Sequence, residues 1–193
     1  MKRISYLVVG LALLLGCGQG RVTENGDNSL RPGELPAMTK GLGADVEQDL
    51  ATLRRVTASF RDFDAAKHAG WATPITPCMT DPGGAGGMGF HYGKTTLIDG
   101  TVHVATPQLL LYEPEKNGRL RLVAVEYIIP YSFHSRDAAP PRLFNQDFQQ
   151  VDAFQLWGLH AWVWRNNPSG MFASWNPNVN CDNTTAISAM SHN

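Results

Sequence analysis

The sequence is short of charge and of cysteine. Charged residues make up 17% of the 193 residues, three residues are cysteines, and 16 basic residues against 17 acidic ones give a net charge of −1. A protein that binds nucleic acid through its phosphates needs a basic excess, so this composition argues against a nucleic-acid partner. Hydrophobic residues nonetheless reach 43%, which excludes general disorder and predicts a folded domain.

The apolar run at the start of the chain is too short to cross a bilayer. It covers about ten residues, 6–15, whereas a spanning helix needs about 20. Lys2 and Arg3 precede it, and a basic start followed by a short apolar run is typical of a secretory signal peptide. We therefore predict a signal peptide over residues 1–16.

The end of this run, Leu14-Leu15-Gly16-Cys17, resembles the lipobox of bacterial lipoproteins. The resemblance implies cleavage after Gly16 and lipid on Cys17, so a membrane becomes a partner that the protein is anchored to without spanning it. Gly18 in place of Asp favours, by the same resemblance, the outer membrane of the bacterial cell envelope, facing the periplasm or the cell surface. The alternative is an ordinary secretory signal with a chance cysteine.

The segment after Cys17 is polar and punctuated by glycine and proline, as flexible tethers are. We assign residues 17–41 to the lipidated cysteine and its tether, and residues 42–193 to a single globular domain. Cys78 and Cys181 then remain, and in an oxidising compartment a disulfide between them is the default prediction. The alternatives are two unpaired thiols or a thiolate metal ligand.

Periodicity predicts one helix and a hairpin. Apolar residues recur every three or four positions from Val46 to Phe63, with Arg54 among the charged residues of the other face. Asp45 can cap this helix and Gly70 can end it. Apolar runs over residues 109–112 and 120–129 flank an Asn-Gly turn signal and predict a β-hairpin.

The rest of the domain is expected to be mostly loop, with one more strand over residues 156–164. The 19 glycines and 12 prolines disfavour a helix bundle. The predicted fold is α+β, with one long N-terminal helix packed on a mostly antiparallel sheet, many loops and one disulfide. Residues 74–93 and 133–150 are among the segments expected to be loop.

Gly84, Gly86 and Gly89 match the G-x-G-x-x-G pattern of dinucleotide-binding loops. That function requires a strand before the glycines and a helix after them, whereas prolines precede these and H-Y-G-K-T-T follows. We therefore expect no nucleotide cofactor. The glycines instead predict a tight turn that brings His91 to a defined place.

Glu126 is the most informative residue, because it interrupts the apolar stretch L-V-A-V-E-Y-I-I. Side chains alternate along a strand, so both faces of this one are apolar at its centre. A carboxylate there must be protonated, hydrogen-bonded, paired with a cation or bound to a metal. The alternatives to a role in a site are a structural pair with an arginine or a tryptophan N–H, and an exposed strand end.

His91 and His160 complete a candidate metal site with Glu126. Two imidazoles and a carboxylate suit Zn²⁺, or a facial triad for Fe²⁺ or Mn²⁺, with copper as a further candidate. No H-x-H or H-E-x-x-H spacing is present, so the fold must bring the three together. Taken alone, His160 is better explained as a hydrogen-bonded core residue, and His91 has no preferred interpretation.

Four other residues are candidates for supporting roles. Tyr92 and Tyr127 can orient the ligands or act as acid–base groups. His134 and His103 are reserve ligands, and His103 is expected to be solvated because it alternates with Val102 and Val104.

Several stretches together resemble a family of secreted or lipid-anchored bacterial proteins that is uncharacterised. They lie between residues 71 and 181 and are G-M-G-F-H-Y, L-L-L-Y-E, L-V-A-V-E-Y-I-I-P, L-H-A-W-V-W-R-N-N-P-S-G-M-F and W-N-P-N-V-N-C. The resemblance implies no activity. It draws attention to His91, Glu126 and His160, which all fall within these stretches.

Three functions are compatible with the sequence. The first is an envelope lipoprotein whose metal has an open position that activates water or a substrate. The second is a metal-free binding module, in which Trp157, Trp162, Trp164 and Trp175 offer aromatic surfaces to a flat ligand. The third is a structural envelope protein whose polar residues only satisfy its core. The sequence identifies no small-molecule or envelope partner.

Overall fold

The computed structural model describes residues 41–184, so the predicted signal peptide, Cys17 and almost all of the tether lie outside the described residues. The main sheet is antiparallel, with strand order β1-β2-β3-β4-β8-β7, and β5 and β6 form a separate pair. The strands are β1 (Thr73–Thr80), β2 (Gly87–Gly93), β3 (Leu109–Pro114), β4 (Leu120–Pro130), β5 (Arg142–Leu143), β6 (Gln146–Asp147), β7 (Gln149–Val151) and β8 (Leu156–Ala161).

The single helix that periodicity predicts is interrupted. Its parts are α1 (Ala44–Thr57), a 3-10 turn (Ala58–Arg61) and α2 (Phe63–His68). The break lies at Asp62, whose carboxylate accepts hydrogen bonds from the backbone N–H groups of Asp64 and Ala65 and so caps α2. The end at Gly70 is confirmed, since its φ of 107° is one that glycine adopts without strain.

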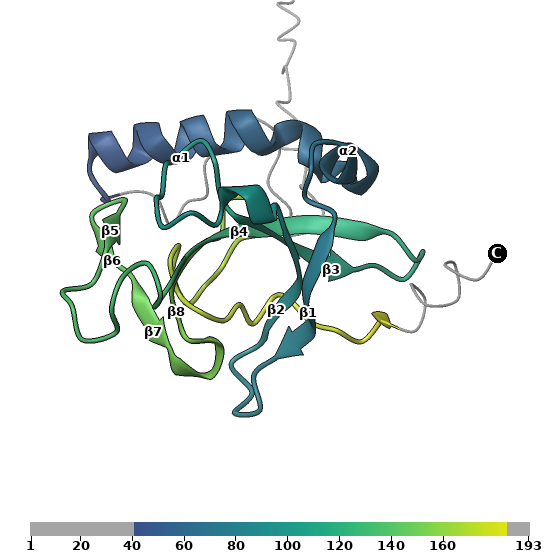
Figure 1. Cartoon of the computed structure of the whole chain (residues 1–193). Helices are drawn as coiled ribbons and strands as arrows, with labels where there is room; N and C mark the ends of the chain where they lie inside the picture. The colour runs from purple at the N-terminus through teal and green to yellow at the C-terminus, as the bar shows by residue number, and fades with distance from the viewer. Residues whose placement is uncertain (1–40, 185–193) are drawn as a thin grey trace, which may run out of the picture.

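The start of α1 also differs from the prediction. The capping position is Gly43, without a side-chain cap, and Asp45 lies in the first turn, where its charge favours the helix dipole. α1 lies across one side of the sheet (Figure 1). Within the described residues, no helix combines the length and the apolar character that crossing a membrane requires.

Arg54 was expected on the exposed face of α1, but only 3% of it is exposed. Its guanidinium donates to the carbonyl of Val163 and stacks over the ring of Trp164, 4.4 Å from the ring centre. A planar guanidinium can be buried in this way because a carbonyl and an aromatic face together replace its water. The buried face of α1 is therefore wider than the pattern of its hydrophobic residues indicates.

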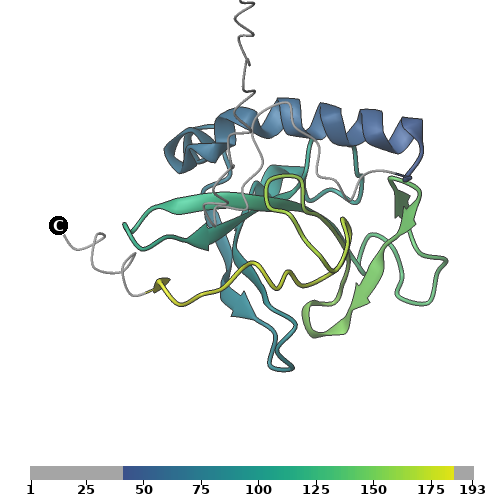
Figure 2. The same ribbon diagram turned by 180° about the vertical axis from the view of Figure 1, so that it is seen from behind.

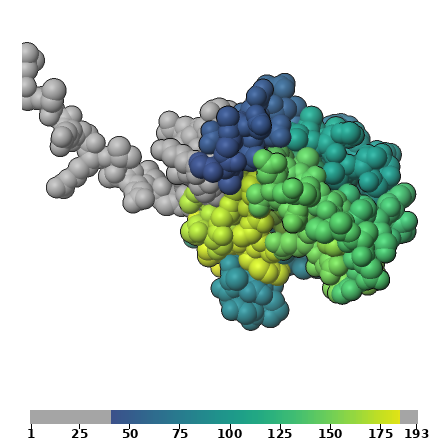
Figure 3. Space-filling model, turned by 90° about the vertical axis from the view of Figure 1, so that its left-hand side faces the viewer, coloured from purple at the N-terminus to yellow at the C-terminus, as the bar shows by residue number. Residues whose placement is uncertain are grey.

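Residues 74–93 were expected to be loop, but they form most of the antiparallel hairpin β1–β2. Its prolines are tolerated because β1 is an edge strand of the sheet. The predicted tight turn is confirmed: Gly84 and Gly86 have positive φ, and a Cβ on Gly86 would lie 2.1 Å from the carbonyl oxygen of Asn176. Figure 3 shows the tip of this hairpin projecting from the domain beside the C-terminal segment.

The remaining strand predictions hold in their main parts. The hairpin over residues 109–129 is confirmed as β3–β4, and β8 pairs with β4 on its other side. β8 ends at Ala161, earlier than expected, because the N–H of Val163 turns back to the carbonyl of Ala161. The segment 133–150 was expected to be loop throughout, but it contains the short strands β5 and β6 and the start of β7.

The C-terminal segment closes the curled sheet. Ser174 donates to Gln149 in β7 at 2.8 Å, and Asn176 pairs through its backbone with Gly87 in β2. The predicted disulfide between Cys78 and Cys181 is confirmed and fixes the same segment to β1. In Figures 1 and 2 this segment, drawn in yellow, runs between the two edges of the sheet.

Candidate metal centre

Strand register places the three predicted ligands on one face of the sheet. Glu126 in β4 is directly opposite His160 in β8 and Leu109 in β3. His91 in β2 is opposite Leu111, which lies two residues along β3 from Leu109. Directly opposed residues share a face, and so do residues two apart on one strand. Three strands therefore deliver one side chain each to the same region.

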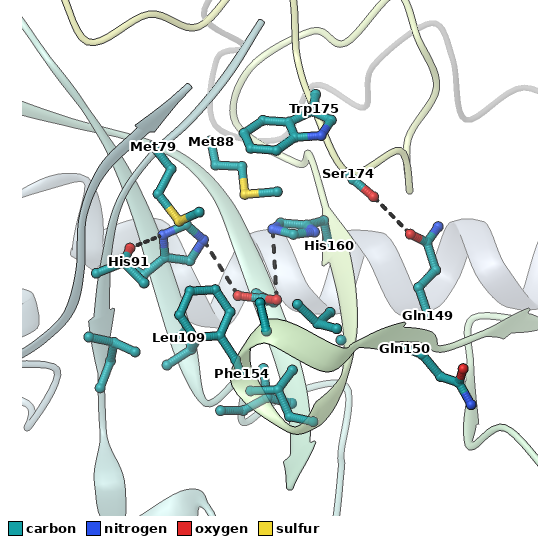
Figure 4. A pocket seen from close by; sticks show the side chains of 18 residues that line it. Met79, Met88, His91, Leu109, Gln149, Gln150, Phe154, His160, Ser174 and Trp175 are labelled. Carbon is teal, nitrogen blue, oxygen red and sulfur yellow. Dashed lines mark hydrogen bonds and ion pairs between the residues drawn. The ribbon is translucent and has the colours of Figure 1, made fainter. Parts of the chain in front are cut away.

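The three side chains converge closely. The Nε2 atom of His91 is 3.5 Å from one carboxylate oxygen of Glu126, and Nε2 of His160 is 3.9 Å from the other. Each residue offers a ligand atom within 4.8 Å of those of the other two. Their exposed fractions are 3%, 7% and 7%. Figure 4 shows both imidazoles among the side chains that line one pocket, each directed at the same carboxylate.

Neighbouring groups hold the imidazoles in place. Oγ1 of Thr76 in β1 lies 2.8 Å from Nδ1 of His91, so the other ring nitrogen is directed at Glu126. The ring of His160 is stacked with that of Trp162. Nε2 of His160 is buried and has no hydrogen-bond partner among the described residues. A buried nitrogen without a partner costs free energy, which a bond to a metal ion would remove.

Burial sets the protonation states of the cluster. It raises the pKa of Glu126 to about 8 and lowers that of His160 to about 4. Burial, with a smaller contribution from His160, lowers the pKa of His91 to about 3. Near neutral pH both imidazoles are therefore neutral, which is the form that binds metals, while the carboxyl group keeps a proton that a metal ion must displace.

Gly158 leaves room for the carboxylate. A Cβ at this position in β8 would lie 2.9 Å from the carboxylate oxygen of Glu126 that faces His160. Sequence reasoning assigned no role in the site to Gly158 or to Thr76. The available signal for Gly158 was its position two residues before His160, on the same face of the predicted strand.

A cavity of about 500 Å³ opens over the cluster. Most of its wall is apolar, with side chains that include Met79, Met88, Leu109, Ile128, Leu156 and Trp175. Ile75 and Phe154 also line it and are 41% and 51% exposed, so they stand at its rim. Met79, Met88 and Trp175 gather beside the imidazoles in Figure 4. Ligands that reach the cluster through this cavity would contact mainly hydrocarbon.

The residues predicted to support the site do not contact the cluster of His91, Glu126 and His160. Tyr127 is adjacent to Glu126 on the strand, so it points to the opposite face, where its hydroxyl donates to the carbonyl of Val104. Tyr92 is likewise adjacent to His91 and packs on Phe63. His134 donates from Nε2 to the carbonyl of Ala139 in an exposed turn. His103 is exposed, as expected.

The tryptophans expected to form a binding surface are mostly core residues. Trp157, Trp162 and Trp164 are buried, and their indole N–H groups donate to His134, Ala173 and Thr57. Trp175 alone of the predicted four lines the cavity over the cluster. Trp164 lies in the core and not on the face of His160, because the bend at Val163 turns it towards α1.

The structural alternative proposed for Glu126 describes Glu113 instead. The buried carboxylate of Glu113 accepts a hydrogen bond from the backbone of Asn180 at 3.1 Å and lies 3.9 Å from the guanidinium of Arg165. Glu126 is not in that situation, since the groups that face its carboxylate are two imidazoles.

Comparison of the chain with protein-family models, curated proteins and solved structures found no match. The function is therefore argued from the site, and the resemblance to a bacterial family stays a prediction.

Proposed function

We propose that this protein is a lipid-anchored protein of the bacterial cell envelope that holds one divalent transition metal through His91, Glu126 and His160. The observation that carries the proposal is the convergence of three buried ligand atoms within 4.8 Å of one another, on three different strands. The unpartnered Nε2 of His160 and the space that Gly158 leaves beside the carboxylate support it.

The donor set restricts the metal. Two imidazole nitrogens and one carboxylate oxygen suit Zn²⁺, Fe²⁺, Mn²⁺ or copper, and they do not form the oxygen-rich cage that Ca²⁺ requires. Three protein ligands leave at least one coordination position for a ligand from the cavity. A metal with such an open position polarises a bound ligand or lowers the pKa of bound water.

The first prediction concerns metal content. The protein, purified without a histidine tag and exposed to Zn²⁺, Fe²⁺, Mn²⁺ and copper in turn, should retain about one equivalent of at least one metal after gel filtration. His91→Ala, Glu126→Gln and His160→Ala should each lower the affinity at least tenfold. His103→Ala is the matched control, because it removes an exposed imidazole outside the cluster. No metal in the parent, or equal metal in all variants, contradicts the proposal.

The second prediction concerns the anchor, which rests on the sequence around Cys17 alone. Cys17→Ser should move the protein from the membrane fraction to the soluble fraction of a bacterial host, because a lipid chain is what holds a non-spanning protein there. The measurement is immunoblotting of fractionated cells, with the mass of the mature N-terminus as the second readout. Unchanged fractionation together with an unmodified N-terminus would contradict lipidation.

A metal-free binding pocket is the second candidate function. It is favoured by the raised pKa of Glu126, which keeps its carboxyl group protonated and the cluster uncharged near neutral pH. Such a cluster is stable inside an apolar cavity without an ion. The metal measurements above distinguish the two functions, since this one predicts no metal in the parent protein.

A further inference from the structure

The charge of a metal-loaded centre selects what can occupy its open position. A divalent ion bound by one carboxylate and two neutral imidazoles leaves a net charge of +1. The ligand residues are buried, and the surrounding wall is largely apolar. A buried charge without a partner is costly, so an anion is favoured over a neutral ligand at this position.

The shape of the cavity selects the rest of the ligand. The wall around the cluster includes Leu109, Met79 and Met88, and the same lining contains the exposed side chains of Ile75 and Phe154. The volume of about 500 Å³ is within the range of pockets that enclose a small organic molecule. Exposed apolar side chains at a pocket rim are suited to contact an apolar chain that extends beyond it.

We propose that the cavity binds a small amphiphile, with an anionic head group on the metal and an aliphatic tail that runs along the apolar wall to Ile75 and Phe154. Straight-chain monocarboxylates of medium length represent this class. The inference rests on the proposed metal site, and it adds the chemical class of the ligand.

The test is a chain-length series on the metal-loaded protein. Acetate, butanoate, hexanoate and octanoate are titrated by calorimetry into protein whose metal content has been measured first. Affinity should rise by up to about fourfold for each added methylene group until the tail passes the rim. Octanol, which has the tail without the anion, should bind at least tenfold more weakly than octanoate, and metal-free protein should show the same loss for octanoate.

A pair of variants tests the path of the tail. Phe154→Ser should weaken octanoate binding several-fold and leave acetate binding unchanged, because only the longer chain reaches the rim. Phe133→Ser is the matched control: Phe133 is 58% exposed and is not part of the cavity wall, so its loss should affect neither ligand.

The outcomes separate this inference from the metal site itself. The proposed amphiphilic ligand is overturned, and the metal site is not, by either of two results in fully metal-loaded protein. One is equal affinity for acetate and octanoate, and the other is octanol bound as tightly as octanoate. Equal binding of octanoate to metal-free protein overturns the placement of the head group. Failure to load any metal overturns both proposals.

Discussion

Glu126 shows how burial alters a single residue. Its neighbours in sequence are apolar, its carboxylate faces two imidazoles, and burial raises its pKa to about 8. The burial could be predicted from the alternation of β4, which leaves no polar face at the centre of that strand. His91 and His160 could be named as candidate partners, but their contact with this carboxylate could not be predicted, because the three residues belong to strands that are distant in the sequence.

The third prediction follows from these pKa values in the metal-free protein. Relative to its ordinary value of 4.5, the pKa of Glu126 is raised to about 8, so its contribution to stability is complete below pH 4.5 and lost as the pH rises towards 8. The pKa values of His91 and His160 are lowered from 6.5, so their contribution to stability is complete above pH 6.5. It is lost as the pH falls towards 3 for His91 and towards 4 for His160.

The free energy of unfolding should therefore have a maximum at about pH 6–7 and decline by a few kcal/mol on either side. Urea denaturation at a series of pH values measures it, in the presence of a chelator. Glu126→Gln should remove the decline above neutral pH and keep a decline on the acid side, made steeper because Glu126 no longer offsets the two histidines. A decline above neutral pH of the same size in this variant would show that another group causes it.

At the scale of elements, the hairpin β3–β4 followed from two apolar runs and an Asn-Gly turn. The hairpin β1–β2 did not, because prolines and glycines resemble a loop when the position of the strand in the sheet is unknown. β1 is an edge strand, where a proline costs no ladder bond, and the glycines allow Asn176 to approach. Asp62 likewise divides a helix that apolar spacing alone describes as continuous.

The fourth prediction concerns the packing of β8 against β4. Gly158→Ala adds a methyl group 2.9 Å from a carboxylate oxygen of Glu126, so the carboxylate must turn away from His160. We expect metal affinity to fall about tenfold or more, with a smaller effect on stability, as for other changes beside a metal ligand. The control is Ala161→Gly, which changes β8 without crowding Glu126. Gly170→Ala is unsuitable as a control, because Gly170 has a positive φ that would strain an alanine.

Calorimetric titration of the loaded metal into each variant measures this effect. An affinity for Gly158→Ala equal to that of the parent would show that the carboxylate does not need the space, and would argue against Glu126 as a ligand.

At the scale of the whole molecule, the C-terminal segment completes the wall of the pocket. It contributes Ser174 and Trp175 to the cavity wall, reaches β7 through Gln149 and is fixed to β1 by the disulfide. α1 covers the other side of the sheet, where Tyr127 and Tyr112 point. The helix therefore stabilises the sheet from the side opposite the cluster, while the C-terminal segment, held by the disulfide, forms part of the cavity wall over the cluster.

The sequence alone determined what depends on local spacing and on simple counting. It was sufficient to predict the α+β class and the β3–β4 hairpin, and it favoured the pairing of Cys78 with Cys181 and the burial of Glu126 over their alternatives. Only the tertiary structure decided that His91 and His160 meet that carboxylate, and that Tyr92, Tyr127 and His134 do not. The reason is that strand order and register join residues far apart in the chain, and a shift of one residue would turn each side chain to the opposite face.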